Sequence, residues 1–119
     1  MTKQELLQRT KSYVLRVIKV VQALPRDDVA KVLGKQLLRA GTSVGANYRA
    51  ACRGRSAADF IGKLKIVEEE ADESLYWMDL LVESNIMPQR RLAALMCEGN
   101  EIVSMIVAAI KTTRAARTS

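Results

Sequence analysis

Basic side chains recur along one side of a predicted helix over residues 27–52, with a spacing suited to binding phosphate. At about 100° per residue they fall within an arc of roughly 80°. The cations of this basic stripe are Lys31, Lys35, Arg39, Arg49 and Arg53. Arg55 and Lys63 extend the stripe beyond the helix. Cations arranged in this way contact the phosphates of RNA or DNA without reading the bases. The stripe therefore predicts a sequence-independent nucleic-acid interface.

The same cations have a second interpretation, because an acidic helix follows them in the chain. Residues 25–55 carry a net charge of +5 and residues 56–84 carry −6. Most of the negative charge lies in the run from Glu68 to Glu73. The basic stripe can therefore be a solvated helix face, or can pair with the acidic helix of a neighbouring subunit.

Catalytic and metal-binding chemistry is poorly represented in the sequence. The chain has no histidine, which removes the commonest general base and most catalytic zinc sites. A carboxylate-bridged metal pair needs inward-facing glutamates on several helices, whereas most of the acidic run faces away from the predicted core. The segment Gly41–Gly45 lacks the Gly-Lys-Ser/Thr ending of a phosphate-binding loop. We expect no enzymatic activity, no metal and no cofactor.

Three polar residues lie in or beside the apolar stripes, here called seams, that the predicted helices should bury: Ser43, Asn47 and Ser74. A buried polar group needs a hydrogen-bond partner or destabilises the fold by about 1–3 kcal/mol. We expect a buried polar network that fixes the helix register. A ligand site inside the bundle is the alternative.

Four apolar residues lie on the outer face of the acidic helix, among glutamates: Ile66, Tyr76, Trp77 and Leu80. An apolar patch rimmed by charges predicts contact with a second subunit or another protein. Scattered surface hydrophobic residues are the alternative.

Apolar residues recur at helical spacing in four segments, at about residues 3–24, 27–52, 57–84 and 88–116. Pro25 ends the first segment, Gly54 is expected to end the second in a left-handed conformation, and Pro88 suits the start of the fourth. Gly41 adjoins a seam, which predicts close approach of a neighbouring helix there. Four long helices with short turns predict an all-α, antiparallel up-down-up-down four-helix bundle that takes in all 119 residues as one domain.

The composition fits a single core, because 49% of the residues are hydrophobic. Cys52 and Cys97 are isolated, so we expect buried free thiols in a reducing compartment. No stretch approaches the roughly 20 uncharged apolar residues of a membrane span, and the first residues do not resemble a signal peptide. We expect a cytoplasmic protein without a membrane partner.

Three stretches, Gln36–Asn47, Gly54–Phe60 and Lys63–Leu75, carry a resemblance to a known family. The first contains Leu-Arg-Ala-Gly-Thr-Ser-Val-Gly-Ala-Asn, the second is a turn of small residues, and the third is the acidic helix. Together they resemble the bacterial four-helix-bundle family whose first members are encoded in intervening sequences of large-subunit ribosomal RNA genes. The resemblance covers about two-thirds of the chain.

The resemblance implies a barrel-like homopentamer. The accessory proteins of diversity-generating retroelements are similar: they are basic pentamers that bind nucleic acid and a reverse transcriptase. This chain has Tyr-Arg-Ala-Ala at residues 48–51, where Ile-Ala-Glu-Gly is usual, so a role of that glutamate does not carry over. Two hypotheses follow: a nucleic-acid-binding accessory factor, in one form serving a reverse transcriptase, or a protein-interaction scaffold whose charge serves self-assembly.

Overall fold

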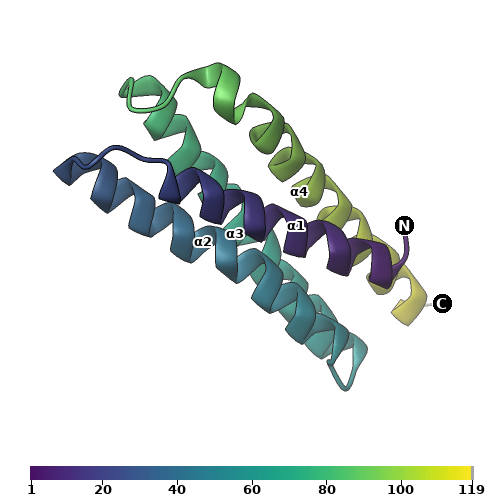
Figure 1. The fold of residues 1–119 in the computed structure, drawn as a ribbon. Helices are drawn as coiled ribbons and strands as arrows, with labels where there is room; N and C mark the ends of the chain where they lie inside the picture. The colour runs from purple at the N-terminus through teal and green to yellow at the C-terminus, as the bar shows by residue number, and fades with distance from the viewer. Residues whose placement is uncertain (119) are drawn as a thin grey trace.

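The computed structural model of the chain describes residues 1–118, and all of the regular elements in that range are helices. Their bounds are α1 Lys3–Gln22, α2 Asp28–Cys52, α3 Ala57–Glu83 and α4 Gln89–Thr118. The helices lie side by side in an elongated bundle of 52 × 21 × 19 Å (Figure 1). α2 packs against α1 and α3, α4 packs against α3, and α1 meets α4 over a short stretch. The predicted all-α class with four helices is confirmed.

The first three helices, α1, α2 and α3, begin at side-chain caps. The side chains of Thr2, Asp27 and Ser56 each accept a hydrogen bond from the amide three residues later, at 3.1, 3.0 and 3.1 Å. Such caps satisfy amides that the first helical turn leaves unpaired. α1 ends at Gln22, two residues earlier than expected, because the residue before Pro25 is disfavoured in a helical conformation.

The end of α2 differs from the prediction, which was wrong about Gly54. No glycine within residues 1–118 has a positive φ, and α2 is capped by Arg53 with φ −99°. The left-handed residue is instead Asn85, with φ 62°, just after α3. There the Ile86 amide donates to the Leu81 carbonyl at 3.0 Å. Asparagine tolerates this conformation better than most residues, so the chain reverses at that point.

The core follows the predicted apolar seams in α3 and α4, and departs from them locally in α1 and α2. Tyr13 and Tyr48 are almost fully buried, with 0% and 1% exposure. By the 3-4 spacing of their apolar residues, the seams over residues 3–24 and 27–52 include Val14 and Asn47 instead, and both lie at the edge of the core. The next seam residue in each helix is buried as that spacing predicts, so each of these departures is confined to one position.

α1 and α2 approach closely where α2 has glycines. A Cβ atom at Gly41 would lie 2.7 Å from Val17 Cγ1, and one at Gly45 would lie 2.8 Å from Val14 Cγ2. Real Cβ atoms do not come this close to another carbon, so only glycine fits at these positions. The predicted close approach at Gly41 is confirmed.

α4 is more apolar than we expected from the sequence. By length and composition alone, Gln89–Arg117 could cross a membrane. In its most apolar window, 28% of the helix is buried in the bundle. Leu92, Ile102 and Ile106 of this helix are fully buried and fill the core. A core helix of a bundle meets the same criteria, so the composition of α4 does not decide between the two.

Candidate nucleic-acid interface

The structure divides the basic stripe into groups with different surroundings, and the middle one is paired. Arg39 Nη1 donates to Glu70 Oε2 at 3.0 Å, and its Nη2 contacts Glu73. Glu73 also accepts a hydrogen bond from Trp77 Nε1 at 3.2 Å. The bond from Arg39 is the main reason that the pKa of Glu73 is lowered. The charge of Arg39 is therefore balanced by α3 of its own chain.

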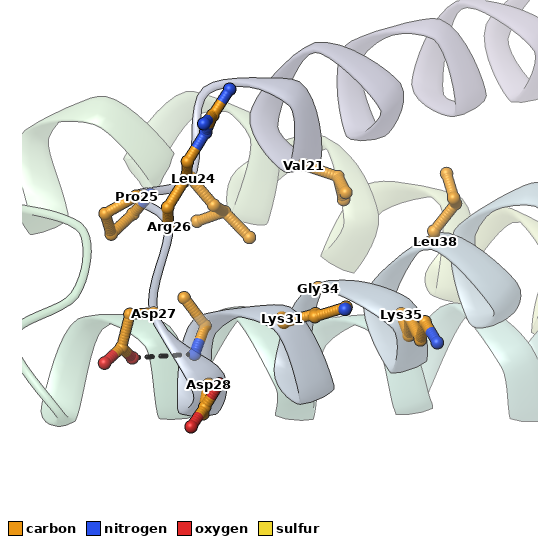
Figure 2. A pocket seen from close by; sticks show the side chains of 11 residues that line it. Val21, Leu24, Pro25, Arg26, Asp27, Asp28, Lys31, Gly34, Lys35 and Leu38 are labelled. Carbon is orange, nitrogen blue, oxygen red and sulfur yellow. Dashed lines mark hydrogen bonds between the residues drawn. The ribbon is translucent and has the colours of Figure 1, made fainter.

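Lys31 and Lys35 lie near the start of α2, where acidic residues accompany them. They line a pocket of about 800 Å³ between the α1–α2 turn and α2, together with Arg26, Asp27 and Asp28 (Figure 2). Asp27 is bonded to the first turn of α2, as the dashed line in Figure 2 shows. Positive and negative charges are mixed at this end of the stripe, which makes it a weaker phosphate site.

Arg49 and Arg53 lie in a different setting, along the groove between α1 and α2. This groove has a volume of about 750 Å³, and its third cation is Lys11 of α1. Leu7 and Val14 are among its apolar lining residues, and no carboxylate from residues 1–118 lines it. Lys11 was not predicted, because spacing along one helix cannot show which residues of another helix lie opposite.

Arg53 also belongs to a second group, at the α2–α3 turn. Here Arg53, Arg55 and Lys63 line a pocket of about 320 Å³, with Asp59 as its single acidic residue. The predicted cations past the end of α2 therefore lie next to those within it. The C-terminal half of the basic stripe is continuous around the turn.

The expected polar network forms only in part. Ser74 is buried, with its Oγ 2.7 Å from the Tyr13 hydroxyl and 2.6 Å from the Ala71 carbonyl, to which it donates. Burial raises the pKa of Tyr13 to about 12, so its hydroxyl stays protonated at neutral pH. Ser43 and Asn47 are only half-buried, and Asn47 Nδ2 donates to the Ser43 carbonyl of its own helix at 2.9 Å. The network that joins helices is therefore Tyr13–Ser74, and the prediction for Ser43 and Asn47 was wrong.

The four residues predicted to form one apolar patch lie in two places. Ile66 is 38% exposed and lines the pocket at the α2–α3 turn. Tyr76 is 56% exposed and packs edge-on against Trp77, with ring centroids 5.2 Å apart. Ten residues of helix, about 15 Å, separate Ile66 from Tyr76. Leu80, one turn beyond Tyr76, belongs with the aromatic pair.

Two valines of α2 extend the aromatic part of this patch. Arg39 bonds Glu73 across antiparallel helices, so Val32, seven residues before Arg39, lies level with Leu80, seven residues after Glu73. Val29 lies one turn before Val32 on the surface of α2, and the two side chains are 55% and 60% exposed. The resulting surface, here called the α2–α3 patch, comprises Val29, Val32, Tyr76, Trp77 and Leu80. The valines could not be assigned to it from the sequence, because the register of α2 on α3 was unknown.

A second arginine, Arg9, joins α1 to α4. Its guanidinium donates to both carboxylate oxygens of Glu98, at 3.0 and 2.6 Å, and to Glu101 at 2.6 Å. The hydrogen bonding from Arg9 is the main reason that the pKa of Glu98 is lowered. Cys97 lies beside this pair and is exposed, contrary to expectation, whereas Cys52 is half-buried; both thiols are free.

These features define an all-helical bundle protein with a divided basic surface. Residues 2–108 match the family of 23S rRNA-intervening sequence proteins, and the chain belongs to this family. The resemblance found in the sequence is thereby confirmed. The chain is similar to a crystal structure of a protein with unknown function from the S23 ribosomal protein family of Bacteroides thetaiotaomicron. That protein is 32% identical, with 89% of this chain and 98% of that chain covered and a TM-score of 0.84. No curated protein gave a significant match.

Proposed function

We propose that this protein is a non-enzymatic accessory factor that binds RNA or DNA by the phosphate backbone. The observation that carries the proposal is the groove between α1 and α2, where Lys11, Arg49 and Arg53 lie together without a carboxylate among the described residues that line it. Each cation that meets a phosphate releases condensed counterions, which is the main source of affinity in sequence-independent binding. Arg55 and Lys63 continue the same surface around the α2–α3 turn.

The proposal includes an assembly and a setting, both of which rest on the family resemblance. We propose a ring-like homopentamer in the cytoplasm, and in one form of the proposal its partner is a reverse transcriptase. Five copies of one basic surface would turn a weak phosphate contact into useful avidity, because later contacts become intramolecular. A pentamer would therefore need only a few contacts from each subunit.

Fluorescence anisotropy with a labelled 20-nucleotide RNA and a labelled 20-base-pair DNA, across a salt series, tests the proposal. We expect the logarithm of the binding constant to fall linearly with the logarithm of salt concentration. The slope should be about −0.9 for each phosphate contacted on the duplex and about −0.7 on the single strand. Absence of binding to both probes at low salt would contradict the proposed function.

The α2–α3 patch favours a second candidate, a protein-interaction scaffold. Val29, Val32 and Tyr76 of this patch are each more than half exposed. Asp79 and Glu83 lie beside it, and their proximity raises the pKa of Glu83. An apolar patch rimmed by acids complements the apolar groove rimmed by Lys11, Arg49 and Arg53 in a second copy.

Sedimentation of a Val32→Ser, Tyr76→Ser variant tests the scaffold. Both side chains are exposed, so the helices should remain folded. A lower mass than wild type would assign the patch to self-association. An unchanged mass would exclude the patch from it and leave contact with a different protein.

A further inference from the structure

Charge is segregated along the long axis of the bundle. The start of α1, the last turns of α4 and the α2–α3 turn lie at the same end of the molecule (Figure 1). This basic end, defined as residues 1–12, 46–66 and 106–118, holds 11 of the 19 Lys and Arg residues and 2 of the 13 Asp and Glu residues. Its net charge is +9, and the rest of the chain carries −3. This distribution of charge attracts a polyanion to the basic end of the bundle.

Contacts between helices join the parts of the basic end that α1, α2 and α3 contribute. Lys3 of α1 lies 4.7 Å above the ring of Phe60 in α3, which brings the starts of these two helices together. The α1–α2 groove and the pocket at the α2–α3 turn share Arg53. A strand that follows this surface would pass from Lys11 to Lys63 without crossing an acidic helix face.

α4 adds cations that were not part of the predicted basic stripe. Its last buried residue is Ile110, and the turns beyond it carry Lys111, Arg114 and Arg117, all exposed. Residues 102–118 contain no Asp or Glu, so these cations have no acidic neighbour along α4. By contrast, Arg9 and Arg39 are each held by two glutamates.

We infer that the phosphate backbone is bound at the basic end, with the C-terminal turns of α4 as part of the site and Lys31 and Lys35 outside it. The inference rests on the proposed function and specifies where it acts. The bundle is 21 × 19 Å in cross-section. A duplex carries one charge per about 1.7 Å, so about a dozen backbone charges span that width. Of the 11 cations of the basic end, Arg9 is held by two glutamates, and the other 10 are close to that number.

Three variants, each lacking three exposed cations, test the inference. The α4 variant is Lys111→Gln, Arg114→Gln, Arg117→Gln. The turn variant is Arg53→Gln, Arg55→Gln, Lys63→Gln. The matched control, at the opposite end, is Arg26→Gln, Lys31→Gln, Lys35→Gln. All nine side chains are exposed, so each variant should fold, and circular dichroism melts check this.

Binding is measured by anisotropy with the same RNA and DNA probes. We expect the α4 and turn variants to bind at least tenfold more weakly at 0.1 M salt. On the duplex, their salt slopes should fall by up to about 2.7, which is 0.9 for each of three lost contacts. The control should change affinity by less than about twofold. Its cations lie at the opposite end of the bundle, and at this salt concentration charges more than about 10 Å apart are largely screened from each other.

The outcomes separate this inference from the proposed function. If wild type binds and the control weakens as much as the α4 and turn variants, the inference is overturned and the proposed function stands. If wild type binds neither probe, the proposed function itself fails. If wild type binds vesicles of anionic lipid and neither nucleic acid, the basic end serves a membrane surface, and both are overturned.

Discussion

Arg39 in the middle of the bundle, and Arg9 toward the inner limit of the basic end, each contact two glutamates, whereas Arg53 and Arg55 at the α2–α3 turn have no carboxylate within ion-pair distance in residues 1–118. Packing differs in the same way. A Cβ at Gly41, in the middle, would collide with Val17, but one at Gly62, at the basic end, would meet no atom within 4 Å. Arginine side chains that pair with glutamates therefore stabilise the fold, whereas those of Arg53 and Arg55 are available to contact a ligand. Substitutions in the middle should change stability, and substitutions at the basic end should change binding.

The largest effect on stability is expected from Ser74→Ala. Ser74 is the partner of the Tyr13 hydroxyl, at 2.7 Å, and Tyr13 is fully buried. The substitution leaves a buried hydroxyl without this partner, which should lower the free energy of unfolding by about 2 kcal/mol. Urea unfolding measures the change.

Tyr13→Phe is the matched control for this prediction. It removes the same interhelical bond, but Ser74 keeps its bond to the Ala71 carbonyl, so the loss should be smaller, about 1 kcal/mol. Equal losses in the two variants would show that leaving the Tyr13 hydroxyl without a partner costs no more than removing it, and would contradict the prediction.

Replacing Gly41 and Gly62, one at a time, by alanine tests the contrast in packing. Gly41→Ala gains up to about 1 kcal/mol of helix propensity but forces Cβ against the stiff, β-branched Val17, and overpacking of this kind destabilises by about 1–3 kcal/mol. We expect a net loss of about 1 kcal/mol. Gly62→Ala meets open space and should instead stabilise the protein by up to about 1 kcal/mol. Thermal melts of the two variants should shift in opposite directions, and shifts of one sign would contradict the contrast.

A smaller effect, dependent on pH, is expected at the Arg9–Glu98 pair. The folded-state pKa of Glu98 is lowered from about 4.5, so its contribution to stability is present at neutral pH and is lost as pH falls from 4.5 through the folded pKa. Glu98→Gln should lower the free energy of unfolding by about 1 kcal/mol at pH 7, and by less as the pH falls below 4.5. Glu101, whose side chain is 57% exposed, supplies the control Glu101→Gln with a smaller loss. A loss from Glu98→Gln that is constant from pH 7 to pH 3 would argue against an ionic contribution.

Much of the fold could be predicted because helix periodicity is a local property. The four helices begin and end within two residues of their predicted bounds. What failed depended on more than one helix or on a single turn. Tyr13 and Tyr48 replaced Val14 and Asn47 in the core because the buried side of a helix is set by the neighbours on both of its flanks. The left-handed conformation expected at Gly54 is found at Asn85 instead. The spacing of apolar residues does not indicate which turn requires that conformation.

The candidate site could be predicted only one helix at a time. The basic side of α2 was visible as a spacing pattern. The pairing of Arg39 with Glu70, 31 residues away, depends on the register of α2 on α3 and was invisible. Lys11 was missed for the same reason, because it enters the site only through the packing of α1 on α2.

The most direct test compares Arg39→Gln with Arg53→Gln, measuring both RNA binding across a salt series and urea unfolding. Each variant loses one positive charge from the same helix. We predict that Arg53→Gln lowers the salt slope by about 0.7 and leaves the unfolding midpoint unchanged. Arg39→Gln should lower the unfolding midpoint and leave the slope unchanged, because its charge is already balanced by Glu70 and Glu73. Equal losses of RNA binding in the two variants would contradict the division of the basic surface on which the account rests.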